Sequence, residues 1–383
     1  MNKFFLLLLL ASCRILTANA QGITINVPEI TKPDTTASSK AKITIQGLFQ
    51  ARYAFSGNKN VDVTGLQHMD GKAVDNNYSI KRARLQFTSE ISDRTTVVML
   101  LNLADFEGNP SNKVLENAYI TYRLNPYIHL KMGQFRPAFG LEDMYPVDVI
   151  KSLDYSNQYT AFGNNGWQSF QLGASIFGGV GGAIPIKYEV SMVNGNNRNQ
   201  LTDNNNGKSF STRVEFELEK KLQIKLGLNG GLASVYGSHV YASGADLSAT
   251  VPIVKKWSLE METEFKQGNN HALYYAMDSA KRVGTVSQYQ MRGMYFLPNI
   301  RYAINYHRLS SLEFSCRYEY FDEDFKHASN PRQTYTPMIS AEFLKAYSAR
   351  IQLGVNIDHY SKNVPLTTQY NNSLFVVQVQ SRL

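Results

Sequence analysis

Residues 373–383 read Ser-Leu-Phe-Val-Val-Gln-Val-Gln-Ser-Arg-Leu, and this stretch shows most directly how the chain folds. Its apolar residues share one face at a spacing of two, and its polar residues share the other. The apolar face carries Phe375, Val377, Val379 and Leu383, and the polar face carries Gln378, Gln380 and Arg382. A strand of this kind suits a barrel in lipid, whose outside meets hydrocarbon and whose inside meets water. A soluble β-sandwich would give the same alternation, so the rest of the chain has to decide.

The same alternation recurs along most of the chain in segments of about ten residues, the length of a membrane-spanning strand. The clearest segments are 210–219, 222–229, 257–266 and 349–358. Helical spacing would instead place Trp257, Glu260 and Glu264 on one stripe, which no apolar core would accept. The repeated period of two therefore indicates strands.

A full pass finds about sixteen such segments, alternately joined by short turns and long polar connections. The segments lie near 42–55, 77–90, 95–104, 113–124, 127–136, 167–178, 184–194, 209–219, 221–230, 240–251, 256–267, 287–304, 311–321, 335–343, 347–359 and 373–383. Two connections on the long side, 105–112 and 231–239, are only modest in length. Long loops on one side and short turns on the other are typical of outer-membrane barrels. The sequence predicts an all-β, transmembrane antiparallel β-barrel domain of about 16 strands over residues 42–383.

The N-terminal residues indicate export. Lys3 precedes an apolar run, and Ala18-Asn19-Ala20 fits a cleavage site, so we expect a signal peptide over 1–20 and a flexible periplasmic lead-in over 21–41. The alternative is lipidation at Cys13, which follows Leu10-Ala11-Ser12. Removal of 1–20 leaves Cys316 as the remaining cysteine, a small apolar filler on the outer face rather than a reactive thiol. No later segment approaches eighteen consecutive apolar residues, so no transmembrane helix is expected.

Three stretches between Tyr78 and Glu142 form a recognisable series. They are Tyr-Ser-Ile-Lys-Arg-Ala-Arg-Leu-Gln-Phe at 78–87, Glu-Asn-Ala-Tyr-Ile-Thr-Tyr at 116–122 and Lys-Met-Gly-Gln-Phe-Arg-Pro-Ala-Phe-Gly-Leu-Glu at 131–142. Their order resembles the phosphate-selective porin O and P family, and Arg317-Tyr318-Glu319 resembles a later strand of that family. The resemblance implies a sixteen-stranded outer-membrane porin, usually a homotrimer, whose third long loop folds into the lumen.

The alternation also predicts which charges line the lumen. If Ala83, Leu85 and Phe87 face lipid, then their neighbours face inward, and the next strands add further cations. The expected pore-lining and anion-binding residues are Arg82, Arg84, Arg123, Lys131, Arg136 and Lys151. Cations on a pore wall raise the local anion concentration, and the planar fork of arginine suits phosphate. The alternative is that these arginines pair with carboxylates and only hold a loop in place.

Residues 137–166 form the longest connection without a strand pattern, and long loops inside compact proteins are usually functional. Their many apolar residues suggest packing against a wall, so we expect a constriction loop that carries Glu142, Asp143 and Asp148. An extracellular flap is the alternative. Acidic residues also line two strands, at Glu215, Glu217 and Glu219 and at Glu260, Glu262 and Glu264. The inner wall is therefore mixed, which favours a general or mildly anion-preferring pore over strong phosphate selectivity.

The formal charge of +8 is too diffuse to indicate nucleic acid. The histidines show no metal spacing, no nucleophile motif is present, and no cofactor is expected. The sequence thus favours a porin, not an enzyme, in the outer membrane of a Gram-negative bacterium. Its expected partners are small hydrophilic or anionic solutes, outer-membrane lipid and lipopolysaccharide, and further copies of itself in a homotrimer. The alternatives are an outer-membrane barrel enzyme and a non-conducting structural or adhesin barrel.

Overall fold

The computed structural model describes residues 42–106, 114–197, 199, 203, 207–344 and 347–382. The expected signal peptide over 1–20, Cys13 and the lead-in over 21–41 lie outside the described residues, as does Leu383. The described strands form one compact unit.

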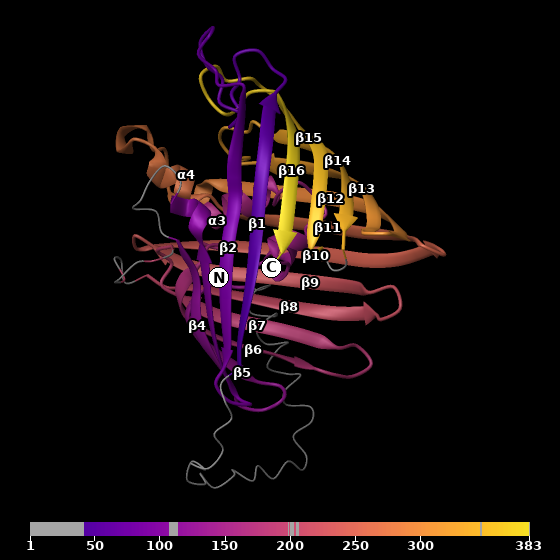
Figure 1. The fold of residues 1–383 in the computed structure, drawn as a ribbon. Helices are drawn as coiled ribbons and strands as arrows, with labels where there is room; N and C mark the ends of the chain where they lie inside the picture. Colours follow the sequence, from indigo (N-terminus) through magenta and orange to yellow (C-terminus); the bar gives the residue numbers. More distant parts are fainter. Residues whose placement is uncertain are drawn as a thin grey trace. The chain divides into compact units, whose positions relative to one another are not determined.

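Within the described residues, sixteen strands form a closed barrel in which each strand pairs with its neighbours in sequence and β1 pairs with β16 (Figure 1). Every pair is antiparallel. The strands are β1 (Lys42–Ser56), β2 (Asn76–Glu90), β3 (Thr95–Asn102), β4 (Leu115–Arg123), β5 (His129–Phe135), β6 (Gln171–Val180), β7 (Ile186–Val193), β8 (Ser209–Glu219), β9 (Ile224–Val235), β10 (Ser238–Val254), β11 (Trp257–Asn269), β12 (Gln290–Tyr306), β13 (Leu309–Asp322), β14 (Arg332–Phe343), β15 (Ala349–Tyr360) and β16 (Asn372–Arg382). The predicted fold class is confirmed.

The two faces of each strand differ as the alternation predicts. In β16, Val377 and Val379 are 43% and 44% exposed, whereas Gln378 and Gln380 are 2% and 4% exposed. Val379 pairs with Ala51 on β1 and with Ile351 on β15, so the apolar face continues across neighbouring strands. The apolar side chains therefore point outward, and the polar side chains point into the ring, where other parts of the protein cover many of them.

The connections alternate in length around the barrel. Short turns join β2 to β3, β4 to β5, β6 to β7, β8 to β9, β10 to β11, β12 to β13 and β14 to β15. The opposite side carries longer connections, with one exception. The sequence predicts a connection over 231–239, but the structure has a turn of two residues, Tyr236 and Gly237. Both residues adopt left-handed backbone angles (φ 48° and 78°), which allow a turn this tight. Such turns join strands tightly, and β9 and β10 consequently extend further than their alternation indicates.

The connection from β5 to β6 contains short helices, although its sequence suggests no regular structure. They are α2 (Leu141–Met144), the 3-10 turn η2 (Val147–Val149) and α3 (Asn157–Asn164). Ser156 caps α3 by accepting a hydrogen bond from the Tyr159 N–H. The remaining helical elements are η1 (Leu103–Phe106), α4 (His271–Ala276), η3 (Ser279–Lys281) and η4 (Val286–Gln288). None of the described helices is long and apolar enough to cross a membrane.

Candidate pore and constriction

The connection 136–170, here called the inner segment, contacts polar side chains on several strands. The Leu141 N–H donates to Glu264 on β11 (2.8 Å), and Lys151 lies 3.3 Å from Glu313 on β13. The Asp148 carbonyl accepts from Gln380 on β16 (2.9 Å). Since these wall residues lie on the polar face of their strands, the inner segment packs against the inward-facing side of the sheet.

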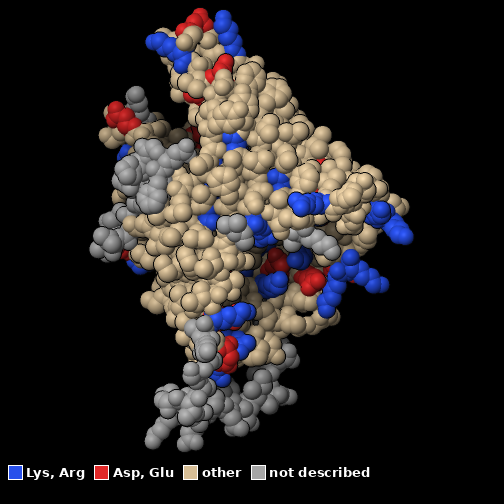
Figure 2. All heavy atoms as spheres, in the orientation of Figure 1, with Lys and Arg blue, Asp and Glu red and all other residues tan. Residues whose placement is uncertain are grey.

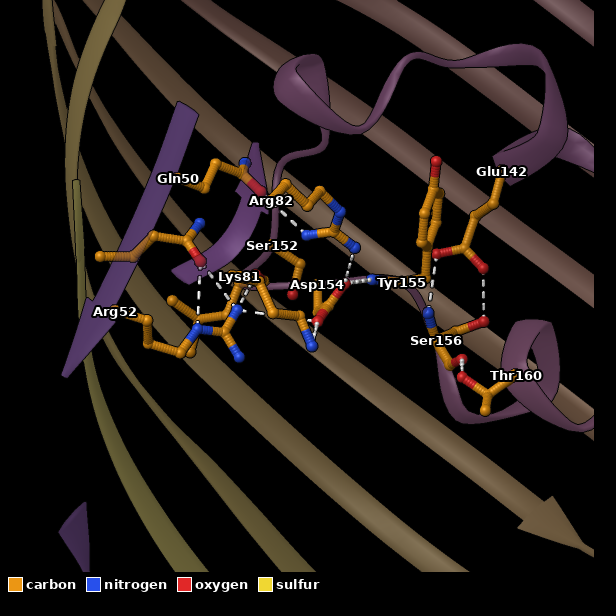
Figure 3. A network of polar contacts seen from close by, with 12 residues as sticks. Gln50, Arg52, Lys81, Arg82, Glu142, Ser152, Asp154, Tyr155, Ser156 and Thr160 are labelled. Carbon is orange, nitrogen blue, oxygen red and sulfur yellow. Dashed lines mark hydrogen bonds and ion pairs between the residues drawn. The ribbon is translucent and has the colours of Figure 1, made fainter. Parts of the chain in front are cut away.

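One carboxylate of the inner segment is surrounded by three cations (Figure 3). Asp154 lies 2.8 Å from Lys81, 2.8 Å from Arg82 and 3.7 Å from Arg52. Burial alone would raise the pKa of Asp154, but attraction to Arg82, Lys81 and Arg52 holds it well below its usual value. The carboxylate is therefore ionised at any physiological pH, and the cluster keeps two positive charges in excess.

A β-bulge brings Lys81 into this cluster. Gln50 on β1 pairs with Arg82, but the next residue, Ala51, pairs with Ile80, so Lys81 is the extra residue on β2. Strict alternation would turn Lys81 outward, because it is adjacent to the inward-facing Arg82. The bulge instead presents both cations to Asp154, which no pattern in the sequence reveals.

The predicted pore-lining residues on β2 are both ion-paired. Arg82 donates to Gln50 Oε1 (2.9 Å) and to Asp154 Oδ1 (2.8 Å). Arg84 forms a two-point contact with Glu116 on β4, through Nη2 to Oε1 and Nε to Oε2, both at 2.9 Å. Two-point contacts of this kind fix the guanidinium plane as well as its position. Arg82 and Arg84 therefore lie side by side on the inner face, but each already has a carboxylate partner.

The other predicted cations of this sector differ in accessibility. Lys131 pairs with Glu189 on β7 (2.9 Å), and its Nζ lies 4.7 Å and 5.0 Å from the ring centroids of Phe135 and Phe177. Aromatic rings around an ammonium stabilise the charge but shield it from solutes. Arg123 lies at the short-turn end of β4, 3.7 Å from Asp93 in the turn between β2 and β3. The structure therefore places Arg123 at the rim, away from the cluster of Arg82.

Arg136 and Asp143 are buried together at the start of the inner segment. The guanidinium of Arg136 lies 3.8 Å from Asp143 Oδ1 and packs over the ring of Phe170. Asp143 also accepts hydrogen bonds from the Phe139 N–H (3.1 Å) and from Gln168 (2.8 Å). Burial nevertheless raises the pKa of Asp143. These contacts hold both ends of the inner segment together.

Lys151 and Asp148 anchor the part of the inner segment that lies nearest the short turns. The ammonium of Lys151 lies 3.2 Å from Glu260 and 3.3 Å from Glu313, and it contacts the hydroxyl of Tyr347. Asp148 forms a close ion pair with Arg382 near the end of β16. Because Tyr347 lies in a short turn and Arg382 near the same edge, the inner segment reaches from the long-loop side of the barrel to the short-turn side.

Glu142 connects the first turn of the inner segment with the start of α3. Its carboxylate accepts from Ser156 N (2.9 Å) and Ser156 Oγ (2.5 Å), and it lies 3.6 Å from Arg317. Burial outweighs the attraction of Arg317, and the repulsion of Glu264 adds to it, so the pKa of Glu142 rises to about 8. Glu142 is thus largely protonated at neutral pH.

Gly140 lets the backbone approach the wall at this point. Its φ is +132°, and an added Cβ would lie 2.4 Å from Glu264 Oε1 and 2.5 Å from Lys266 Nζ. Those two wall side chains form a buried ion pair of 3.0 Å. A Cβ at this position would force the ends of both side chains to shift, and the φ of +132° favours glycine as well.

The acidic strands bear out the expectation of mixed charge on the inner wall. Glu215 contacts Arg213, which also forms a two-point contact with Asp246 on β10 at 2.5 and 3.0 Å. Lys225 lies 3.9 Å from Glu215. The wall opposite the Asp154 cluster therefore carries its own carboxylates, most of them near a cation.

Of the predicted cations, Arg82 and Lys151 form ion pairs between the wall and the inner segment, whereas Arg84 and Lys131 pair with carboxylates of the wall itself. Sequence reasoning selected Arg82 and Arg84 but did not select Arg52, Lys81 or Asp154 as site residues. Arg52 was visible on the polar face of its strand and Asp154 in the long connection. Arg317 was visible in the Arg-Tyr-Glu motif, but its contacts with Glu142 and Glu319 were not.

The fold is the closed antiparallel barrel that is also found in solved structures of outer-membrane channels. Residues 54–229 match the family model of the phosphate-selective porins O and P, the family that the sequence motifs resemble. None of the curated proteins compared with this sequence matches it.

Solved structures with the same fold are distant in sequence. The outer-membrane channel DcaP of Acinetobacter baumannii is 11% identical, with a TM-score of 0.56 over 91% of this chain and 99% of that one. The anion-selective porin from Comamonas acidovorans is 10% identical, with a TM-score of 0.57 over 90% and 100%. The trimer form of OmpT, an outer-membrane protein of Vibrio cholerae, is 9% identical, with a TM-score of 0.54 over 90% and 99%. These likenesses concern the fold. Within the described residues, no group of three His, Cys, Asp or Glu side chains could hold a metal ion.

Proposed function

We propose that this protein is a passive outer-membrane porin for small hydrophilic solutes, with a mild preference for anions, in a Gram-negative bacterium. The observation that carries the proposal is the Asp154 cluster, in which three cations of the β1–β2 wall share one carboxylate. Uncompensated positive charge beside a watery path raises the local concentration of anions and lowers their barrier to entry. The Comamonas acidovorans porin of the same fold is itself anion-selective.

The inner segment narrows this path in our proposal. It contacts β1, β11, β13, β15 and β16, and its anchors at Glu142, Lys151 and Asp148 are buried. A segment held at both ends of the barrel restricts the cross-section for its whole length. The preference stays mild because Arg84 and Lys131 are already paired, and because carboxylates line β8, β10 and β11.

We further propose a homotrimer, surrounded by outer-membrane lipid and lipopolysaccharide. The exposed apolar face of the barrel requires lipid or protein around it. OmpT of Vibrio cholerae, which has this fold, has been described in a trimer form. Scattering of the purified protein in detergent would give the mass of the assembly, and a monomer mass would contradict the trimer.

Conductance in planar bilayers tests the function. We expect stable channels whose reversal potential, in a gradient of potassium chloride, shows a small preference for chloride over potassium. Phosphate should also carry current, whereas a bulky organic cation should not. Clear cation selectivity would contradict the anion preference. An absence of conductance would instead favour the structural or adhesin barrel, and lipid or peptide hydrolysis that one substitution abolishes would favour the enzyme.

A further inference from the structure

The short turns of the barrel differ in charge. The turns at 124–128 and 181–185, which read Leu-Asn-Pro-Tyr-Ile and Gly-Gly-Ala-Ile-Pro, carry no charged residue. The three turns that follow β8, β10 and β12 are strongly basic. Their cations are Lys220, Lys221, Lys255, Lys256 and Arg308, here called the basic rim. Since these turns join consecutive strands, the basic rim forms one continuous arc.

The basic rim is exposed and uncompensated. All five residues are exposed, and Lys and Arg atoms project at the right-hand edge of Figure 2, where Figure 1 draws these turns. Within the part of the chain that the structure describes, none of the five side chains forms an ion pair. The nearby Glu219 accepts a hydrogen bond from the backbone of Lys221 (2.9 Å) instead. The arc therefore has about five positive charges with little to neutralise them.

The surface next to the basic rim is built to face a membrane interface. Trp257 follows Lys256 directly and packs against Tyr302 with a centroid distance of 4.5 Å. Trp257 is 37% exposed and Tyr306, close to Arg308, is 66% exposed. Tryptophan and tyrosine collect at the level of lipid headgroups, where one end of the ring meets hydrocarbon and the other meets water. Cations just beyond this aromatic belt lie at the level of the phosphates.

We infer that the basic rim binds the headgroup phosphates of anionic phospholipids in the leaflet on the short-turn side of the membrane. This inference rests on the proposed function only in that the barrel must span a bilayer. An acidic protein partner would need a contact surface away from the lipid, whereas the arc is continuous with the lipid-facing aromatic residues. Basic residues at this depth concentrate anionic lipid around them, and salt weakens the effect.

Trp257 makes the inference directly measurable. Phospholipids with brominated acyl chains quench the fluorescence of a tryptophan that they touch. The other tryptophan, Trp167, is 2% exposed and packs against Phe139 in an interior cluster, so it adds a constant background. The protein is reconstituted in vesicles of phosphatidylethanolamine and phosphatidylglycerol, with one or the other lipid brominated. We expect about a fivefold preference for phosphatidylglycerol at Trp257, which declines in high salt.

Two matched variants decide the assignment. The rim variant carries Lys220→Gln, Lys221→Gln, Lys255→Gln and Lys256→Gln. The control carries Lys59→Gln, Lys72→Gln, Lys326→Gln and Lys362→Gln, which remove four exposed lysines from the long-loop side. The preference should fall to about one in the rim variant and stay near fivefold in the control.

Equal quenching by the two lipids in the native protein would overturn the inference, as would a preference that survives in the rim variant. Bilayer conductance of the same samples separates this result from the proposed function. A barrel with a lipid preference but no conductance would contradict the porin and leave the lipid site standing. A barrel that conducts but shows no lipid preference would overturn the lipid site and leave the porin standing.

Discussion

Lys81 and Asp154 form an ion pair of 2.8 Å between the wall of the barrel and the inner segment. The pair exists because a bulge on β2 turns Lys81 toward the same side as Arg82. Asp154 therefore neutralises one of the three positive charges around it. Its side chain is 24% exposed, so water reaches the cluster. Asp154 is the carboxylate that Arg52, Lys81 and Arg82 share.

Replacement of Asp154 by Asn should therefore increase anion selectivity. The substitution keeps the size of the side chain but leaves Arg52, Lys81 and Arg82 without their shared carboxylate. We expect the permeability ratio of chloride to potassium to rise about twofold to threefold. Reversal potentials in a potassium chloride gradient measure the ratio.

Asp62→Asn is the matched control, because Asp62 pairs with His68 in the loop between β1 and β2, outside the polar interior. That variant should keep the native ratio. A native ratio in Asp154→Asn would mean that permeating ions do not pass near the cluster. The loss of the shared partner should also destabilise the protein, by about 1 to 2 kcal/mol, because the Asp154 side chain is partly exposed to water.

Glu142 should make the inner segment sensitive to alkaline pH. Its pKa is about 8 in the folded protein, because burial opposes its ionisation, and Arg317 and Lys266 only partly offset burial and the repulsion of Glu264. The folded state therefore holds a proton that the unfolded state has already lost above its ordinary pKa near 4.5. The contribution of Glu142 to stability is thus complete at low pH, declines as the pH rises toward 8, and is lost above it.

The Glu142→Gln variant imitates the protonated carboxyl and should remove this dependence. We expect the unfolding temperature of the native protein in detergent to fall between pH 6 and pH 9, and the fall to be smaller in Glu142→Gln. The open-channel noise of the native pore should increase over the same range as the segment loosens. Identical pH profiles of the two proteins would show that Glu142 is not the titrating group.

An alanine at Gly140 should destabilise the protein. In Gly140→Ala the new Cβ would lie 2.4 Å from Glu264 Oε1, so the buried pair of Glu264 with Lys266 would have to move, and the φ of +132° adds strain. Gly71→Ala is the control for backbone strain alone, because Gly71 has a φ of +74° and no atom within 4 Å of the added Cβ. We expect Gly140→Ala to lower the free energy of unfolding by about 3 kcal/mol, and Gly71→Ala by about 1 kcal/mol. Equal losses in urea titrations would rule out the steric contact.

The barrel could be predicted from the sequence because each strand repeats a local rule. Alternation decides the face of a side chain within a few residues, and pairing with the next strand in the chain then fixes the topology. For β8 the alternation alone predicts both ends of the strand, because the predicted bounds 209–219 are those of the structure. It fails where the backbone departs from it, as at the bulge of Lys81 and at the tight turn of Tyr236 and Gly237.

The site could be predicted only in part, because its contacts join residues far apart in sequence. Arg82 and Arg84 were identifiable as inward-facing cations, but their partners Asp154 and Glu116 depend on where the inner segment and β4 lie. Lys151 was visible as one lysine in a long connection, and nothing local indicates that Glu260, Glu313 and Tyr347 converge on it. The ion-pair partners come from different strands, so they can be identified only once the closed barrel brings those strands together.

Cys316 provides a test of the outward face that does not depend on conductance. It lies on β13 beside Phe314, which is 43% exposed, and it is itself exposed on the face that should meet lipid. In a variant that begins at Gln21 and therefore lacks Cys13, reconstituted in vesicles, a charged, membrane-impermeant maleimide should not label Cys316. The same reagent should label Cys316 after the protein is unfolded in detergent. The control is Lys225→Cys in a Cys316→Ser background, since Lys225 has a side chain that is 33% exposed on the polar face. The impermeant reagent should label that variant, because water fills the interior. Rapid labelling of Cys316 by the charged reagent in intact vesicles would place this face in water and would contradict a barrel that spans the bilayer.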